Sequence, residues 1–295
     1  MAKSHYRLYV LLSLILCSLA FQNCTSKSAK GNEQNLSYLD LRKTHSTVLK
    51  TRGPSPQKWH DIAPLHGVTK VPYTSGDLKL TAWLAMPKNA QADKVPAVVY
   101  FHGGFAFGME EFVDCQPFLD AGFAVMIPTL RGENGNPGNF ELFYGEVDDA
   151  RAAILELTKQ PRIDASRIYT FGHSAGGAIS ALLSLWDDVP IRLGGSSGGL
   201  YSKDVFSGWK DFVPFDLSDD KERKLRLLVG NMSSMKRKHI AYLGEDDTLA
   251  KVVPAADTEI KQSGAPLTIS VIGGDHFTSL ELAASSFANA IKLDK

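Results

Sequence analysis

Several features that mark common functional classes are missing from this chain of 295 residues. The formal net charge is zero, because Lys and Arg together number 32 and Asp and Glu also number 32. A net charge of zero does not impose a strongly basic surface, so nucleic-acid binding loses its usual electrostatic support. The sequence shows no internal repeat, no phosphate-binding loop, no zinc-ligand spacing and no G-x-G-x-x-G after a strand-like run. We therefore expect no metal, no organic cofactor and no nucleic-acid partner.

Cysteine is also scarce, with 3 residues in the whole chain. Removal of an N-terminal leader would leave at most Cys24 and Cys115, so a disulfide framework is not expected. Cys115 is most simply interpreted as a buried, inert small hydrophobe.

The N-terminal apolar run, LYVLLSLILCSLAF at residues 8–21, follows three basic residues and is too short for a comfortable membrane span of ~20 residues. A buried helix is the alternative, but the polar residues that follow favour export. Residues 18–20 offer a cleavage site. Cys24 resembles a bacterial lipoprotein attachment site, although the residues before it match poorly. We predict a signal peptide over residues 1–24, giving a secreted or envelope protein that a lipidated Cys24 would anchor to the membrane.

The chain changes character twice after this leader. Residues 25–60 are polar and contain Gly53, Pro54 and Pro56, which predicts a tether and an irregular arm, with a short helix near residues 36–49. Residues 61–295 are predicted to form one folded domain of ordinary size.

Within that domain, compact apolar runs alternate with helix-like segments. Strands are predicted within 66–87 (two, around a turn at 75–77) and at 94–101, 122–128, 167–172, 190–195, 239–244 and 266–274. The clearest helix covers 145–160, where Val147, Ala150, Ile154 and Leu157 share one face. The alternation predicts an α/β fold with a mostly parallel sheet and helices on both faces. Residues 198–236 lack strand character and are predicted to form a small lid.

A serine between glycines stands in residues 171–177, FGHSAGG, after a predicted strand and before a helix rich in small residues. On a sharp strand-to-helix turn Ser174 would be an exposed nucleophile; a purely structural glycine turn is the alternative. A second formal G-x-S-x-G match, GSSGG at 195–199, precedes a poor helix start. We interpret it as a loop after a strand, with Ser197 the less favoured nucleophile.

The stretch HGGF, residues 102–105, follows the predicted strand 94–101. Acyl transfer needs N–H donors aimed at the oxyanion, and glycines let the backbone approach closely. The backbone N–H groups of Gly104 and Ala175 are the predicted donors. Phe105 is a further candidate for a third N–H donor, and its side chain is a candidate for contact with substrate. His102 is interpreted as an orienting histidine.

The acid and the base are sought in loops after later strands, because ligands bind at the carboxyl ends of parallel strands. His276 follows the last predicted strand, whereas His239 precedes every acid of the loop after 239–244, so only His276 fits the order Ser, acid, His. A buried structural role for His276 is the alternative. Acid candidates are Glu245, Asp246 and Asp247.

Arg131 begins a loop rich in glycine and asparagine, residues 131–139, after another predicted strand. Its guanidinium would either hold substrate or form a structural salt bridge.

Taken together, these motifs resemble the α/β-hydrolase superfamily, specifically the catalytic domain of prolyl oligopeptidase-type serine hydrolases and related esterases, over about residues 68–292. The matching stretches are HGG (102–104), LRG (130–132), GEVDDARAAI (145–154), DASRIYTFGHSAGG (164–177), LGEDD (243–247) and GGDHF (273–277). That family often places its acid three residues after a glycine that follows the strand, which selects Asp247. The resemblance implies an α/β-hydrolase catalytic domain, residues 61–295, with a Ser174–His276–Asp247 triad.

The sequence departs from the family in three features that affect which substrate we expect. Full prolyl oligopeptidases carry a large β-propeller where this sequence has the polar arm, residues 198–236 are short, and Phe105 replaces the third glycine of many lipase-like esterases. We therefore expect a carboxylesterase acting on small esters, with a serine peptidase acting on short peptides as the alternative. A non-catalytic envelope lipoprotein of the same fold is the contrasting class.

Overall fold

The computed structural model describes residues 36–60, 63–88 and 93–294. The predicted signal peptide and Cys24 lie outside the described residues. The chain divides into two compact units, Met1–Thr44 and His45–Lys295. Helix α3 (Tyr38–Thr44) is described in the first unit, within the range predicted for a short helix. No helix in the described parts of the chain has the length and apolarity needed to cross a membrane.

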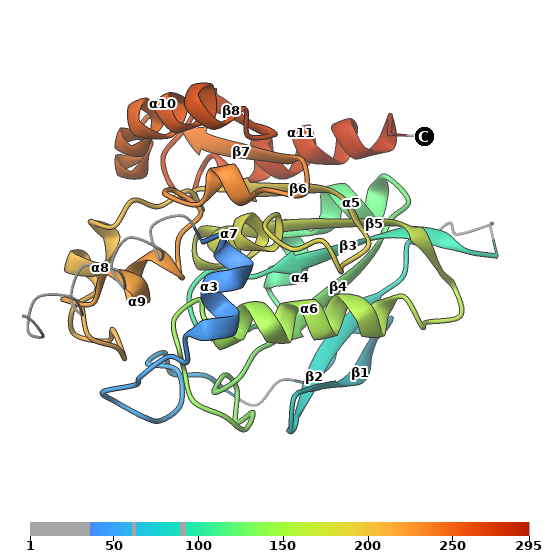
Figure 1. Ribbon diagram of the computed structural model, residues 1–295. Coiled ribbons are helices and arrows are strands. Elements are labelled where there is room, and N and C mark those ends of the chain that lie inside the picture. The colour runs from blue at the N-terminus through green and yellow to red at the C-terminus, as the bar shows by residue number, and fades with distance from the viewer. Residues whose placement is uncertain (1–35, 61–62, 89–92, 295) are drawn as a thin grey trace, which may run out of the picture. The chain divides into compact units, whose positions relative to one another are not determined.

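The second unit is built around one sheet of eight strands (Figure 1). The strands are β1 (Val68–Ser75), β2 (Leu78–Ala85), β3 (Val95–Phe101), β4 (Ala124–Thr129), β5 (Ile163–His173), β6 (Ile191–Ser197), β7 (His239–Gly244) and β8 (Leu267–Ile272). The helices are α4 (Glu111–Asp114), α5 (Gln116–Asp120), α6 (Gly145–Leu157), α7 (Ser174–Leu183), α8 (Val205–Gly208), α9 (Asp220–Lys224), α10 (Val253–Ser263) and α11 (Leu280–Lys292), with the 3-10 helices η1 (Met232–Ser234) and η2 (Thr248–Val252).

The strand order across the sheet is β1-β2-β4-β3-β5-β6-β7-β8. Strand β2 pairs antiparallel with β1 and with β4, and every pair from β4 to β8 is parallel. The predicted mostly parallel sheet is therefore confirmed. The loops after β3, β4, β5, β6, β7 and β8 consequently all leave the same edge of the sheet, the arrangement in which an α/β protein binds its ligands.

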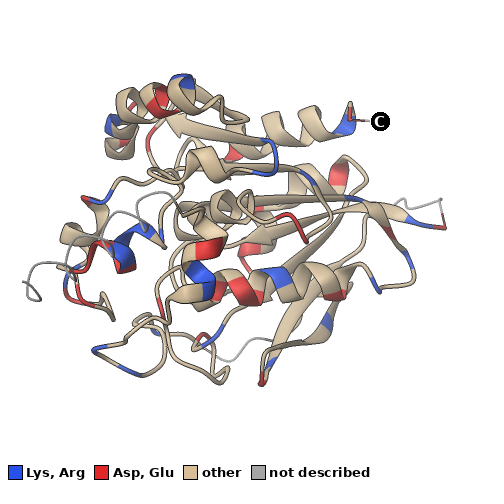
Figure 2. Ribbon diagram, in the orientation of Figure 1, with Lys and Arg blue, Asp and Glu red and all other residues tan. Residues whose placement is uncertain are grey.

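Helices cover both faces of this sheet, as predicted. Helices α6 and α7 pack on one face, and α4, α5 and α11 lie on the other (Figure 1). The predicted apolar face of α6 is buried, and charged residues of both signs are interspersed along its remaining surface (Figure 2). On the opposite face, the rings of Phe118, Phe171 and Phe287 pack with centroids 5.2 to 6.3 Å apart. Cys115 is buried and unpaired in this core, where burial raises the pKa of its thiol.

Strand β6 differs from its prediction because it continues to Ser197. The second serine-glycine match therefore begins inside a strand and is not only a loop. Two positions of this strand are glycines because neighbouring rings fill the space that a side chain would need. A Cβ at Gly195 would lie 2.6 Å from Phe287 Cδ2, and one at Gly194 would lie 2.6 Å from His239 Nδ1.

Two further segments bear on the site. Residues 198–236 contain only the short helices α8, α9 and η1 as regular structure. Residues 45–60 of the predicted arm belong to the same compact unit as the sheet.

Candidate active site

The turn from β5 into α7 places Ser174 at the carboxyl edge of the sheet. Ser174 has a φ of 51°, in the left-handed region that non-glycine residues rarely adopt. A Cβ at Gly172 would overlap the carbonyl oxygen of Gly176, and a Cβ at Gly176 would overlap the carbonyl oxygen of Phe101. Both glycines are therefore required by the close backbone packing of this sharp turn.

Three side chains from three loops meet at this turn. Ser174 Oγ lies 2.9 Å from His276 Nε2, and His276 Nδ1 lies 2.8 Å from Asp247 Oδ2. A carboxylate accepts hydrogen bonds only, so His276 carries its proton on Nδ1 and Nε2 is free to accept from the serine hydroxyl.

The three acidic residues in the loop after β7 differ in their exposure to solvent. Asp247 is 4% exposed, and its Oδ1 accepts a 2.9 Å hydrogen bond from the Leu249 N–H. Glu245 and Asp246 are exposed to solvent. Only Asp247 has the buried, oriented carboxylate that a neighbouring imidazole requires.

The other histidine after Ser174 lies elsewhere in the sheet. His239 is buried at the start of β7, where its Nε2 lies 2.9 Å from Ser196 Oγ. Burial lowers the pKa of His239 to about 3, so its imidazole is neutral and occupied by a partner within the core.

The HGGF loop after β3 lies against the serine turn. A Cβ at Gly103 would lie 3.8 Å from Ser174 Cβ. His102 Nδ1 lies 3.0 Å from the Gly103 carbonyl oxygen, and its Nε2 lies 3.2 Å from Glu133 Oε2. Burial opposes the charged form of His102, but the charge and hydrogen bond of Glu133 outweigh it and raise the pKa to about 9. Both ring nitrogens then donate, so His102 orients the loop, as interpreted from the sequence.

The sequence predicts two backbone N–H groups as oxyanion donors, those of Gly104 and Ala175. The Gly103 carbonyl held by His102 shares a peptide group with the Gly104 N–H, and these two groups point in opposite directions. The Ala175 N–H belongs to the first turn of α7, where backbone donors have no partner within the helix and the dipole favours negative charge. The N–H of Phe105, the further candidate, instead donates to Gln57 Oε1 at 2.9 Å, which corrects that expectation.

Aromatic side chains gather around Phe105, and one of them reaches Ser174. Tyr201 Oη lies 3.3 Å from Ser174 Oγ, and its ring stacks on Phe143. The rings within 4.9 to 6.5 Å of the Phe105 ring are Phe140, Phe143, Trp209 and Phe212. Phe105 therefore belongs to an aromatic cluster drawn from the loops after β3, β4 and β6.

Comparison with known proteins gives this geometry a context. The BD-FAE family matches residues 84–205. The chain is 27% identical over 185 residues to "Uncharacterized peptidase YtmA" of Bacillus subtilis, covering 62% of this chain and 65% of that protein. An acylaminoacyl peptidase of Pyrococcus horikoshii has a TM-score of 0.60 at 21% identity, covering 77% of this chain and 40% of that one. A Pyrococcus furiosus esterase has a TM-score of 0.61 at 18% identity, covering 82% and 96%.

The chain has the α/β-hydrolase fold. It resembles prolyl oligopeptidase-type enzymes and esterases, as the sequence motifs implied. The chain spans less than two thirds of the length of the curated relative and of the peptidase structure that it matches.

In this α/β-hydrolase, Arg131 is held by carboxylates. Its Nε and Nη2 donate to the two oxygens of Asp149 at 2.9 and 2.8 Å, and its Nη1 donates to Glu141 Oε1 at 2.9 Å. Burial disfavours the charge, but the hydrogen bonds to Asp149 raise the pKa above the usual range of arginine. Of the two roles left open for Arg131, this geometry favours the structural salt bridge over contact with substrate.

Three residues near this site were not predicted from the sequence to have a role in it. Gly198 has a φ of +62°, and a Cβ there would lie 2.7 Å from His276 Cε1, so its missing side chain gives the histidine room. Tyr201 and Gln57 contact the serine and the HGGF loop. The glycines after β6 were the one available signal, because glycine in a strand end often marks a close approach. In the described residues, no group of three or more His, Cys, Asp or Glu side chains is arranged to hold a metal ion.

Proposed function

We propose that this chain is a serine hydrolase that forms an acyl-enzyme on Ser174. The hydrogen-bonded series Ser174–His276–Asp247 carries the proposal. During attack on a carbonyl carbon, His276 Nε2 takes the serine proton, while the buried Asp247 carboxylate stabilises the imidazolium that forms.

The N–H groups of Gly104 and Ala175 stabilise the negative charge that develops on the carbonyl oxygen, a contribution of about 10²–10³ in rate for each donor in comparable sites. The His276 imidazolium then returns its proton to the leaving group. Water activated by His276 subsequently attacks the acyl-enzyme and regenerates Ser174.

We propose small carboxylic esters as the substrates. This choice is supported by the esterase neighbour, of which the chain covers 96%. A peptidase acting on short peptides is the second candidate, and the names of the Bacillus relative and of the acylaminoacyl peptidase neighbour favour it. A panel of p-nitrophenyl esters and aminoacyl p-nitroanilides separates the two. Higher kcat/KM on the anilides would replace the esterase by the peptidase.

The catalytic proposal itself is tested with a fluorophosphonate probe, which phosphonylates an activated serine. We expect the wild-type chain to be labelled, Ser174→Ala to lose all labelling, and Ser197→Ala to be labelled like the wild type. A folded wild-type chain that is not labelled contradicts the proposal and favours the non-catalytic class.

A further inference from the structure

Residues 45–57, which we call the strap, pass along three of the loops that leave the carboxyl edge of the sheet. One end contacts the segment after β6, the middle contacts the loop after β4, and the other end contacts the HGGF loop after β3. The strap has no strand or helix of its own. Its position is therefore set by the individual contacts along it.

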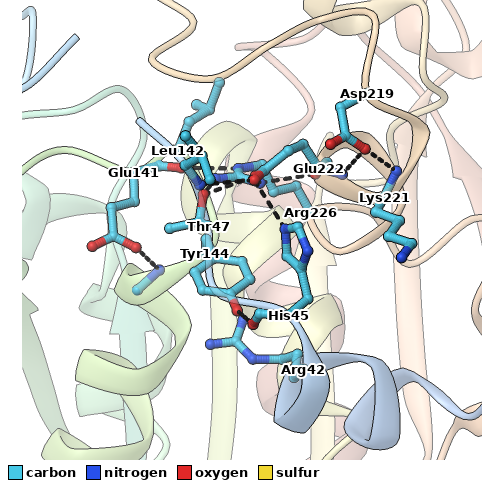
Figure 3. Close-up of polar contacts among 12 residues, drawn as sticks. Arg42, His45, Thr47, Glu141, Leu142, Tyr144, Asp219, Lys221, Glu222 and Arg226 are labelled. Carbon is cyan, nitrogen blue, oxygen red and sulfur yellow. Dashed lines mark hydrogen bonds and ion pairs between the residues drawn. The ribbon is translucent and has the colours of Figure 1, made fainter. Parts of the chain in front are cut away.

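The first end of the strap is fixed by a buried ion pair (Figure 3). Glu222 and Arg226 are 1% and 0% exposed and form a salt bridge. Glu222 Oε1 accepts from the Val48 N–H at 2.9 Å, its Oε2 accepts from Thr47 Oγ1 at 2.8 Å, and Arg226 Nη2 donates to Thr47 Oγ1 at 2.7 Å. The strap thus satisfies polar groups that would be costly to leave buried without partners.

Backbone hydrogen bonds hold the middle of the strap. The Lys50 N–H donates to the Pro214 carbonyl at 2.6 Å, and the Ser55 N–H donates to the Gly132 carbonyl at 2.9 Å. The Gly53 carbonyl accepts from the Phe140 N–H at 2.9 Å. These bonds lead the chain to Gln57 along a defined course.

At the second end, the Gln57 side chain packs against the oxyanion turn. Gln57 Oε1 accepts the Phe105 N–H at 2.9 Å. It lies only 2.5 Å from where a Cβ of Gly104 would be, and Gly104 has a left-handed φ of +67°. The side-chain carbonyl therefore occupies space that only a glycine at position 104 leaves free.

Two neighbouring peptide groups of the turn are thus held from two sides. His102 holds the Gly103–Gly104 peptide by its carbonyl oxygen, and Gln57 holds the Gly104–Phe105 peptide by its N–H. Gly104 lies between them, so the two contacts together set the direction of its N–H. Gln57 is exposed, so without it water would take its place at the Phe105 N–H, and protein contacts would hold the left-handed Gly104 from one side only.

We propose that Gln57 is a positioning residue of the acyl-transfer site, which keeps the Gly104 N–H directed at the oxyanion by binding the N–H of Phe105. This inference rests on the proposed function. The opposite effect is also physically defined: a glutamine carbonyl that competed with substrate for a third oxyanion donor would slow the reaction, and its removal would accelerate it.

The experiment uses Gln57→Met, which keeps the length of the side chain and removes its hydrogen-bonding groups. With p-nitrophenyl acetate as substrate, we expect kcat to fall about 3- to 10-fold, the effect of one net hydrogen bond, and KM to change less than 2-fold. The affinity for trifluoroacetophenone, whose serine adduct carries an oxyanion, should fall by the same factor as kcat/KM. A residue that only stabilised the fold would not reproduce this match. Thermal melting verifies that the variant is folded.

Lys58→Met is the matched control, since it removes a long polar side chain from the next residue, and it should leave kcat unchanged. An unchanged or raised kcat in a folded Gln57→Met variant overturns the positioning role while wild-type turnover still supports the hydrolase. A fall in kcat without loss of inhibitor affinity overturns it as well. Absence of wild-type turnover and labelling would remove the proposed function, and this inference with it.

Discussion

Two segments of this molecule satisfy the same five-residue pattern, G-x-S-x-G, and the structure uses them in different ways. In residues 172–176, Ser174 begins a helix and its hydroxyl meets His276. In residues 195–199, Ser197 ends strand β6 and is fully buried. The second segment contributes a different residue to the site, Gly198, whose missing side chain leaves space for the histidine.

The comparison teaches that the pattern alone does not specify the local structure, and that the surroundings decide which atom is presented. The first segment is followed by ten helical residues, so its serine is displayed at a helix N-terminus. The second is followed by a segment without regular structure until α8, and its backbone passes beneath the imidazole of His276. Substitutions in the two segments should therefore differ in both size and cause.

The largest contrast is expected between the two serines. Ser174→Ala removes the proposed nucleophile and should lower kcat by about 10⁶, the loss seen when a serine protease loses its serine or histidine. Ser197→Ala removes a buried hydroxyl. This change has little effect on stability when no hydrogen bond is lost, so kcat should stay within 2-fold. Stopped assays with p-nitrophenyl esters measure both. Comparable losses in the two variants would show that the first serine is not the nucleophile.

The next largest effect concerns the acid that lies beside the second segment. A Cβ at Gly198 would be 3.3 Å from Asp247 Oδ2. The carboxylate and the histidine therefore both pack against the side of Gly198 where a side chain would be. Asp247→Asn places an amide donor against His276 Nδ1, which forces the wrong tautomer and should lower kcat by about 10⁴. Asp246→Asn, an exposed neighbour, serves as the control and should keep wild-type turnover. A larger loss in the control than in Asp247→Asn would assign the acid to the neighbour.

Gly198→Ala tests the second segment directly. The new Cβ would lie 2.7 Å from His276 Cε1 and would also occupy a left-handed conformation, so the imidazole must move. Because a displacement of about 1 Å lowers rates roughly 10²-fold, we expect a loss of that order in kcat. Gly208→Ala is the matched control, since a Cβ there meets nothing within 4 Å, and it should be neutral. Wild-type kcat in folded Gly198→Ala would show that the close approach is not needed.

The fold was largely predictable because its strands are compact apolar runs and its helices carry one buried face. Strand ends were less predictable, since pairing with neighbours sets them. β5 begins at Ile163, four residues before the predicted start, because Ile163 pairs with Val95 of β3. The polar character of that first stretch gave no local sign of a strand.

The residues of the candidate site also differ in how far the sequence could predict them. Ser174 and His276 could be predicted because a strand, a glycine turn and chain order point to them. Gln57 could not, since it lies in a polar arm without periodicity and contacts a residue 48 positions away. Tyr201 likewise follows β6 in a segment with no strand or helix pattern, and only tertiary packing brings its hydroxyl to the serine.

Tyr201→Phe should have the smallest effect, and it tests a contact between Ser174 and the chain that directly follows the second segment. Burial raises the pKa of Tyr201 well above its usual range, so the phenol stays protonated. Since the Ser174 hydroxyl donates to His276, the Tyr201 O–H is left to donate to Ser174 Oγ, 3.3 Å away. Phenylalanine keeps the aromatic packing and removes this hydrogen bond, and a long hydrogen bond of this kind should be worth about 2- to 5-fold in kcat.

Tyr242→Phe, a buried tyrosine of β7, is the matched control and should keep wild-type kcat. Steady-state rates on p-nitrophenyl acetate measure both variants, and the rate of fluorophosphonate labelling should fall in parallel with kcat for Tyr201→Phe, because both reactions begin with attack by the same oxygen. If kcat rises, the hydroxyl restrains the serine instead of supporting its attack. If kcat falls while labelling stays at the wild-type rate, Tyr201 acts after attack and does not support the serine as a nucleophile.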